Sequence, residues 1–380
     1  MKFPFGIQTF EKIREGGYVY VDKTKLIYDL VDQGKYYFLS RPRRFGKSLL
    51  VSTLEAYFEG RRDLFEGLAI DSLETKWEQY PVFHLDLSNA IYDSPKVLKN
   101  KLCWHVSEWG SQYGATSTSD SPSLRFEEAL RRAYEQTGRR VVVLVDEYDA
   151  PVVNVIDEPE LFETNRANLI AFFQTLKAYD RYVKFAFLTS VTKFGQNSPF
   201  SSFNNLDNIS FSKDFDAICG YTEQELHDYF DEEVAAMASE NGMAKEECYQ
   251  RLHEMFGGYH FSRKFKEVYN PSAILNALKQ KDFFNEWFFK GTPAALRLAL
   301  KGTDDDITEL PGAYTKVDHL VNVDSYTENL LPLFYQSGYL TLKEETRTGF
   351  IILDFPNDSV RDSFNNYLIP YCASVAKKKE

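Results

Sequence analysis

The chain has 380 residues, of which 43% are apolar and 26% are charged, and this composition excludes global disorder, fibrous repeats and low-complexity sequence. Its length predicts two to three domains. The 44 basic and 56 acidic residues give a net charge of −12, which argues against a general cation-rich surface for nucleic acid.

Short β-rich runs alternate with longer helical patterns between residues 36 and 212. The predicted strands are 36–40, 82–87, 141–146, 183–190 and 208–212. The predicted helices between them are 49–58, 121–138 and 163–180. Such alternation is typical of parallel strands joined by crossover helices. We therefore predict an α/β fold with a three-layer domain and a mainly parallel sheet over residues 1–220.

The pattern changes after residue 220. Thr222 and Glu225 have the spacing of a capping box that opens a long helix, and Asn270 followed by Pro271 opens another. From here to about residue 302 the sequence reads as helical. We predict a helical subdomain over residues 221–302.

The C-terminal part has a different order of elements. Residues 329–338 are predicted to form a helix, 339–343 and 350–355 a two-stranded ribbon, and 358–371 a final helix. This order fits a winged-helix-like module over residues 303–380.

The loop SRPRRFGKSLL at 40–50 carries the strongest functional signal. A predicted strand runs into a loop that ends in Gly46, Lys47 and Ser48, and a helix follows directly, which is the context of a phosphate-binding P-loop (Walker A). Backbone N–H groups and the helix dipole attract anions there. We expect Lys47 to reach the β- and γ-phosphates of ATP and Ser48 to bind Mg²⁺. The residues expected to bind the nucleotide are Arg43, Arg44, Phe45, Gly46, Lys47, Ser48 and Leu49.

The start of this loop departs from the motif GxxxxGK[ST]. Arg41 stands where the motif has its first glycine, and larger residues follow it. If that position needed a positive φ, a non-glycine residue would cost about 1–2 kcal/mol, so we expect a different backbone path at the start of the loop. The alternative is a basic loop with a chance GKS sequence.

A second motif, VVVLVDEYDAP at 141–151, is an aliphatic strand that ends in two acids and is typical of a Walker B element. Asp146 is expected to hold Mg²⁺ and Glu147 to orient or polarise the attacking water. Asp149 has two alternatives, support of the metal shell or capping of the following turn.

A third strand ends in Thr189 and Ser190. Thr189 is expected to sense the γ-phosphate and joins Glu147 and Lys47 as a predicted catalytic residue, although a plain strand end is the alternative. Extra transition-state charge could come from Lys193, Arg43 or Arg44, and the spacing does not choose among them.

Ten stretches of the chain together match a known pattern. They are FPFGIQTFEKIREGGYVYVDKTKLI, SRPRRFGKSLL, VVVLVDEYDAP, FLTSVTKFG, FNNLDNIS, ICGYTEQEL, GGYHF, YNPSAIL, SGYLTL and FPNDSVRDSF. In them the sequence resembles the AAA-ATPase-like proteins that are abundant in gut bacteria. The resemblance implies a P-loop ATPase core of the AAA+/STAND kind with helical and winged-helix parts, and it implies that Arg41 belongs to the family's own loop. It also implies that residues 20–27 lie near the adenine.

Proteins of this family commonly continue into a PD-(D/E)XK nuclease-like domain, and no such site is recognisable in this chain. The nearest match, Glu74 to Lys76 with Asp71, lies in a polar connection and reads as chance. A nucleic-acid partner is therefore expected only through a nuclease domain outside this chain. The winged-helix-like module has an unfavourable balance of charge for phosphate contact.

The cysteines and the apolar runs bear on location. Cys103, Cys219, Cys248 and Cys372 include no CxxC pair, which favours a reducing compartment over a disulfide framework. The longest aliphatic run, 141–145, is too short to cross a bilayer. We expect a cytoplasmic protein with no membrane partner.

The sequence thus predicts an enzyme that binds ATP and Mg²⁺ and hydrolyses ATP to ADP and phosphate. One alternative is a nucleotide-gated switch or scaffold with slow or no turnover. Another is a winged-helix DNA-binding protein whose P-loop has a structural role. A homo-oligomer remains open, since an arginine that assists hydrolysis can come from a neighbouring copy.

Overall fold

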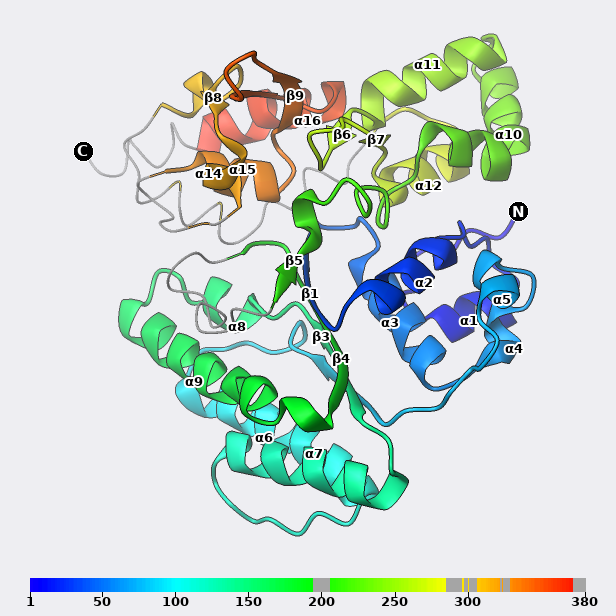
Figure 1. Cartoon of the computed structure of the whole chain (residues 1–380). Helices are drawn as coiled ribbons and strands as arrows, with labels where there is room; N and C mark the ends of the chain where they lie inside the picture. Colours follow the sequence, from blue (N-terminus) through cyan, green and yellow to red (C-terminus); the bar gives the residue numbers. More distant parts are fainter. Residues whose placement is uncertain are drawn as a thin grey trace.

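A five-stranded sheet forms the centre of the computed structural model, which describes residues 1–193, 206–284, 296, 300, 306–321, 323 and 329–371 (Figure 1). The strands lie in the order β2-β3-β4-β1-β5, and every neighbouring pair is parallel. They are β1 (Tyr36–Ser40), β2 (Val82–Asp86), β3 (Val141–Asp146), β4 (Val183–Ser190) and β5 (Asp207–Asn208). The predicted parallel sheet is confirmed.

The last predicted strand is shorter than expected. β5 ends at Asn208, and a short 3₁₀-helix (Ile209–Phe211) replaces the rest of it. The cause is local, because the side chain of Asn208 accepts a hydrogen bond from the backbone N–H of Ser210 and draws the chain into a turn.

Burial follows the position of each strand in the sheet. Every residue of β1 and β3 is buried, as expected for central strands covered on both faces, whereas burial alternates along the edge strand β2. In the register of the sheet, Asp86 pairs with Asp146 and Ser40 pairs with Ser190. The carboxyl ends of β1 to β4 therefore reach the same edge.

Helices cover both faces of the sheet and complete three layers (Figure 1). One face carries α6 (Pro95–Gln112), α7 (Pro122–Thr137) and α9 (Pro159–Ala178), with α8 (Ala150–Val153) and a 3₁₀-turn (Asp180–Tyr182). The other carries α1 (Phe10–Glu15), α2 (Thr24–Gln33), α3 (Lys47–Phe58), α4 (Arg62–Phe65) and α5 (Ala69–Leu73). Each face has its own apolar core, so alternate strand residues pack in opposite directions.

The next region is helical with one interruption. Its helices are α10 (Glu223–Glu240), α11 (Lys245–Phe256) and α12 (Pro271–Gln280). The predicted capping box is confirmed, because Thr222 and Glu225 exchange both hydrogen bonds, and Asn270 caps α12. The expectation of a continuously helical stretch is wrong between α11 and α12, where β6 (Tyr259–His260) and β7 (Glu267–Val268) form an antiparallel ribbon. Gly258, with φ 79°, begins this turn away from helix.

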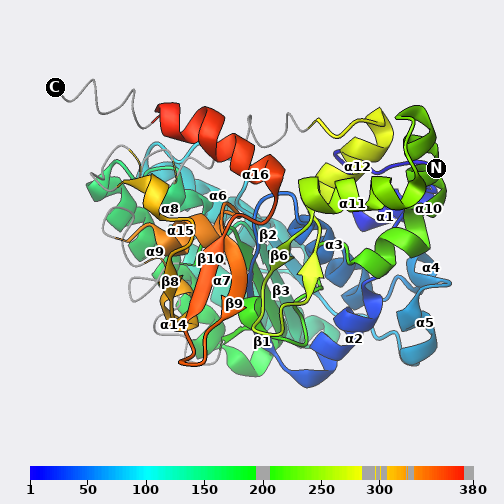
Figure 2. The same cartoon turned by 90° about the horizontal axis from the view of Figure 1, so that it is seen from above.

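The C-terminal part, which we call the C-terminal module (306–371), lies over the carboxyl edge of the sheet (Figures 1 and 2). It contains a 3₁₀-turn (Ile307–Glu309), β8 (Tyr314–Thr315), α14 (Val317–Leu320), α15 (Leu331–Gln336), β9 (Thr341–Glu345), β10 (Ile351–Asp354), α16 (Asp358–Ser363) and a π-helical turn (Phe364–Leu368). The predicted order of helix, two strands and helix is present. The sequence did not predict β8, which extends the ribbon to the sheet order β8-β10-β9.

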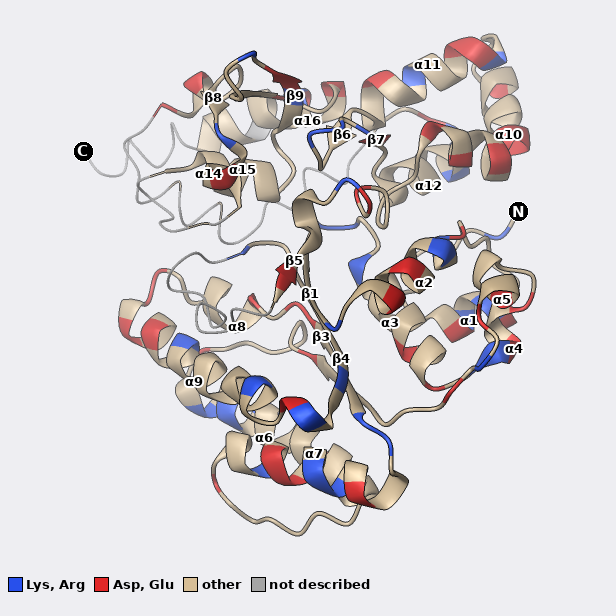
Figure 3. Cartoon of the chain, in the orientation of Figure 1, with Lys and Arg blue, Asp and Glu red and all other residues tan. Residues whose placement is uncertain are grey.

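The predicted domain boundary at residues 302 and 303 lies outside the described residues, as does Cys372. Within the described part of the chain, no helix combines the length and apolar character needed to span a membrane. Figure 3 shows Lys and Arg interspersed with Asp and Glu along the chain, and α10 contains acidic residues without any Lys or Arg.

Candidate functional site

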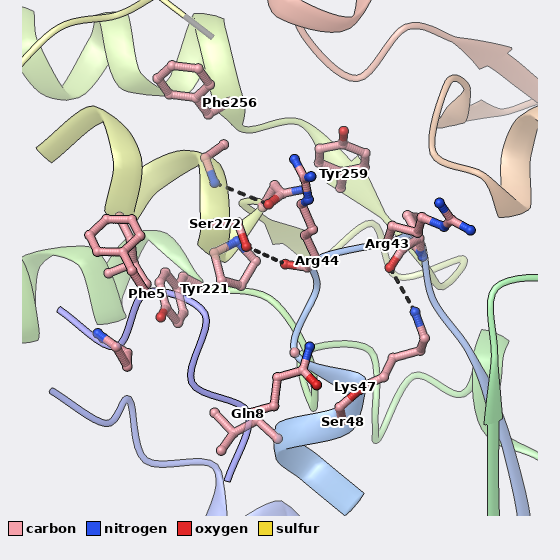
Figure 4. Close-up of a pocket in the computed structure, with 18 of the residues that line it drawn as sticks. Phe5, Gln8, Arg43, Arg44, Lys47, Ser48, Tyr221, Phe256, Tyr259 and Ser272 are labelled. Atoms are coloured by element: carbon pink, nitrogen blue, oxygen red, sulfur yellow. Dashed lines mark hydrogen bonds between the residues drawn. The ribbon is translucent and has the colours of Figure 1, made fainter. Parts of the chain in front are cut away.

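A cavity of about 600 Å³ lies at the carboxyl edge of the sheet (Figure 4). Parallel α/β sheets bind ligands at this edge, and the volume is in the range of small-molecule sites. Its walls come from the N-terminal segment Pro4–Gln8, the loop Arg41–Gly46 between β1 and α3, the start of α12, the β6 turn and the C-terminal module. We call Arg41–Gly46 the β1–α3 loop.

The β1–α3 loop turns with positive φ at two residues, Arg44 (68°) and Gly46 (96°). Arg41 is outside the left-handed region, so the first position of the loop does not need a glycine. Gly46 immediately precedes α3, and its carbonyl accepts the first helical bond, from Leu50, at 3.0 Å. The unpaired N–H groups of the first turn of α3 therefore lie beside the cavity.

Arg41 is buried and anchors the loop instead of facing the cavity. Its guanidinium donates to the carbonyl oxygen of Ser210 at 2.8 Å and to those of Phe215 and Asp216 at 3.3 and 3.4 Å. It also lies 4.1 Å from the ring centroid of Phe261. It also donates to the carbonyl oxygen of the adjacent Ser40 at 2.9 Å. Nothing local in the sequence indicates this role, because the other three carbonyl partners are 169 to 175 residues away.

Lys47 is the first residue of α3 and is buried at the cavity wall. Its ammonium donates to the carbonyl oxygens of Arg41 and Pro42 at 2.9 and 3.1 Å. Burial lowers the pKa of Lys47, and the carboxylates of Glu147 and Asp146 oppose that shift. Ser48 follows and is half-buried in the same wall.

The two acids at the carboxyl end of β3, Asp146 and Glu147, have different surroundings. Asp146 is buried, and one of its carboxylate oxygens accepts hydrogen bonds from the Thr189 hydroxyl and from the backbone N–H of Glu147. Glu147 lines the cavity and adopts a φ of 50°. Such a φ costs a non-glycine residue of order 1–3 kcal/mol, and residues strained in this way cluster at functional sites. Burial raises the pKa of Glu147, against the positive charges of Lys47 and Arg43.

The side chain of Asp149 makes no capping hydrogen bond to the following turn, and Asp149 is not among the residues that line the cavity. Its carboxylate is buried and accepts hydrogen bonds from the backbone N–H and the hydroxyl of Thr192, at 2.9 and 2.8 Å. Asp149 thus connects the end of β3 to the end of β4. Thr189 is also fully buried, with its hydroxyl directed at Asp146.

The other predicted nucleotide-binding residues fall on both sides of the loop. Arg43 and Arg44 are exposed and line the cavity, as do Gly46 and Leu49. The ring of Phe45 points away, into edge-to-face contacts with Tyr259 and Phe261 at centroid distances of 4.9 and 5.4 Å. Only the backbone of Phe45 is therefore available to a ligand.

Several cavity residues were not predicted from sequence. They are Pro4, Phe5, Ile7, Gln8, Tyr221, Met255, Phe256, Tyr259, Ser272, Ser337, Tyr339 and Asn357. Most are apolar or aromatic and come from elements far from the loop, and Ser272 donates to the carbonyl oxygen of Arg44 at 3.4 Å (Figure 4). The Walker A and Walker B patterns could not locate these residues, because apolar residues that line a cavity follow no fixed sequence pattern.

Residues 20–27 lie behind the loop and not in the main cavity. Tyr20, Val21 and Lys23 line a smaller, mostly apolar cavity of about 70 Å³ that adjoins Gly46. Lys23 forms a 2.6 Å ion pair with Glu225 on α10. The visible role of residues 20–27 is to connect the core to α10.

The C-terminal module touches the site directly. Gly338, with φ 87°, approaches so closely that a Cβ there would lie 2.9 Å from the Cβ of Pro42. The side chain of Gln336 accepts from the backbone N–H of Lys193, just past β4, and donates to the carbonyl oxygen of Leu320. The module is therefore joined to the segment that follows Thr189.

The module's own cations are partly occupied. Lys343 donates to the carbonyl oxygen of Pro356 at 3.1 Å, and Arg361 pairs with Asp358 at 2.8 Å. Both cations thus already have partners within the module.

Two comparisons with known proteins agree with this geometry. A family model described as "Predicted AAA-ATPase" matches residues 4–200, which include Pro4–Gln8 and the segments after β1, β3 and β4. The chain is also 34% identical, over 392 aligned residues, to an "Uncharacterized protein in vnfD 5'region" of Azotobacter chroococcum mcd 1. That alignment covers 99% of this chain and 72% of the relative.

Proposed function

The chain belongs to the AAA-ATPase-like family, and we propose that it binds ATP with Mg²⁺ in the cavity and hydrolyses it to ADP and phosphate. The observation that carries this proposal is the meeting of two elements at one cavity wall. Lys47, at the amino end of α3, and Glu147, at the carboxyl end of β3, both line the cavity and each shifts the pKa of the other.

In this proposal the phosphates bind at the amino end of α3. The helix has 12 residues, and its first-turn N–H groups and dipole favour an anion. The ammonium of Lys47 would exchange its two carbonyl partners for phosphate oxygens. Two unit charges 4 Å apart attract by about 4 kcal/mol at an effective dielectric of 20, so Lys47 dominates this interaction.

Ser48 and Asp146 are the residues that would hold Mg²⁺. Hydroxyl and carboxylate oxygens are the ligands this ion prefers, and the hydrogen bonds from Thr189 and Glu147 to one oxygen of Asp146 fix the direction of its carboxylate. Bound Mg²⁺ would neutralise charge on the β- and γ-phosphates. Thr189, fully buried, acts in this scheme by positioning Asp146.

Glu147 is proposed to orient the attacking water. Its φ of 50° turns the residue out of the strand direction at the cavity wall, where Lys47 and Arg43 favour its charged form. The adenine base of ATP is proposed to lie against the apolar wall of Phe5, Ile7 and Phe256. The helical region and a winged-helix-like C-terminal module would then respond to the nucleotide, since both contribute residues to the cavity.

The test is steady-state phosphate release from Mg²⁺-ATP by wild type and Lys47→Ala, with calorimetric titration of ATP into both. We expect turnover by wild type and loss of binding and turnover in Lys47→Ala. Arg62→Ala, an exposed cation 66% accessible on α4, is the matched control and should behave as wild type. Equal ATP affinity in wild type and Lys47→Ala would refute the site.

A nucleotide-gated switch is the second candidate, favoured by one observation. The C-terminal module packs against the β1–α3 loop through Gly338 and Pro42, and Gln336 holds the segment after β4. A module in this place would hinder product release. A single burst of phosphate without steady turnover would support the switch, whereas continuous turnover would support the ATPase.

A further inference from the structure

We propose that Arg43 is a catalytic residue that supplies, within a single chain, positive charge to the γ-phosphate in the transition state of ATP hydrolysis. This inference rests on the proposed function and deepens it. Its basis is the different placement of the three arginines of the β1–α3 loop.

The first of these arginines is used by the fold. Arg41 is 2% exposed, and backbone carbonyl oxygens and the Phe261 ring surround its guanidinium. It has no access to the cavity, and removing its charge would disturb the loop itself.

Arg44 and Arg43 diverge from each other (Figure 4). Arg44 adopts a φ of 68°, its carbonyl oxygen accepts from Ser272, and its side chain rises beside Tyr259. The left-handed turn at Arg44 separates the two side chains, so they face different parts of the cavity.

Arg43 is the arginine of the loop that is left available. It is exposed and lines the cavity, and within the described part of the chain its guanidinium forms no ion pair or hydrogen bond. Arg43 lines the same cavity as Glu147 and Lys47. A flexible cation that lines this cavity can reach the place proposed for the γ-phosphate.

Lys193, the other candidate cation, is placed differently. Its ammonium lies 5.6 Å from the ring centroid of Phe38 on β1, and burial lowers its pKa. It is absent from the residues that line the cavity. The structure therefore favours Arg43 over Lys193.

The chemistry calls for a group of this type. As the water oxygen bonds to the γ-phosphorus, the bond from that phosphorus to the bridging oxygen of ADP breaks, and both water protons end on the phosphate product. Negative charge is spread over the γ and bridging oxygens during this change. A planar guanidinium with several N–H donors can contact two such oxygens together, which an ammonium cannot do equally well.

The experiment compares wild type, Arg43→Ala and Arg43→Lys for ATP turnover, ATP affinity and affinity for ADP with aluminium fluoride, a transition-state analogue. We expect Arg43→Ala to lose at least about 100-fold in kcat, by analogy with other phosphoryl-transfer arginines. Affinity for ATP should change little, affinity for the analogue should fall with kcat, and Arg43→Lys should recover only a small part. The control is Arg140→Ala, because Arg140 is exposed and directly precedes β3, at the edge of the sheet opposite to the cavity.

A separate measurement tests whether Arg43 acts on the ATP that is bound by its own chain. Wild-type kcat should be independent of protein concentration, and mixing Arg43→Ala with Lys47→Ala should restore no activity. Restored activity would show that Arg43 acts on a neighbouring copy and would overturn the proposal, as would an Arg43→Ala kcat within threefold of wild type. Absence of hydrolysis by wild type would refute the proposed function, and this inference with it.

Discussion

Two stretches of this chain look alike in sequence and are used differently. In each, a valine and an aspartate precede another charged residue: Val21-Asp22-Lys23 before α2 and Val145-Asp146-Glu147 at the end of β3. In the first, the oxygens of Asp22 accept from Thr24 and from the backbone N–H of Ala69, and Lys23 pairs with Glu225.

In the second stretch, only one of the two carboxylates has hydrogen-bond partners described within the protein. Asp146 has partners in Thr189 and in its own turn, whereas Glu147 stands at the cavity wall in a left-handed conformation. The comparison teaches that residue type does not separate a structural motif from a functional one. The difference is whether protein groups pair every charge or leave one turned toward a cavity.

The largest expected effect concerns Glu147. Glu147→Gln keeps the shape of the side chain and removes its charge, so ATP should still bind while turnover falls on the order of 10²–10⁴-fold. Phosphate release and ATP calorimetry on the same preparation measure both. Turnover equal to that of wild type would remove Glu147 from the water-orienting role.

The next effect concerns Lys23, in the stretch Val21-Asp22-Lys23. Lys23→Ala leaves the half-buried carboxylate of Glu225 without its cation, and we expect a loss of about 2 kcal/mol in the free energy of unfolding, measured in urea. Turnover per folded molecule should stay the same. A stable variant with reduced turnover would break the comparison, because it would place Lys23 in the site.

A smaller effect is the pH dependence of stability. Burial raises the pKa of Glu147 in the folded protein above its unfolded value. The folded state therefore loses stability as pH rises from the unfolded pKa to the folded pKa, because the buried carboxyl must ionise. A glutamine at this position does not ionise and has no such cost. We expect Glu147→Gln to match wild type in acid and to exceed it at neutral pH. Thermal unfolding at several pH values measures this, with the exposed Glu66→Gln as control. A pH-independent difference would contradict the burial argument.

The smallest effect sharpens the contrast within one motif. Lys25, two residues after Lys23, forms an ion pair with Asp29 but is 63% exposed. Lys25→Ala should change the free energy of unfolding by less than about 0.5 kcal/mol, because water screens such a pair. If Lys23→Ala and Lys25→Ala were equally mild, burial would not explain the role of this stretch.

Much of the fold could be read from local patterns. The apolar runs of β1, β3 and β4 predicted buried parallel strands. Thr222 with Glu225 predicted the start of α10, because hydrogen bonds between near neighbours fix a helix cap. The break between α11 and α12 was missed. There the ribbon β6–β7 is held by contacts with distant parts, among them the bond from the backbone of His260 to Thr341 on β9.

The candidate site divides in the same way. The sequence by itself determined which residues end β1 and β3, and so brought Lys47, Ser48, Asp146 and Glu147 to one edge of a parallel sheet, because the common direction of the strands follows from the alternation of strands and helices. Only the tertiary structure decided which of the loop's charges face the cavity. Arg41 is buried by carbonyl oxygens from 169 to 175 residues away, and Arg43 is left available, because burial depends on packing between segments that the sequence places far apart.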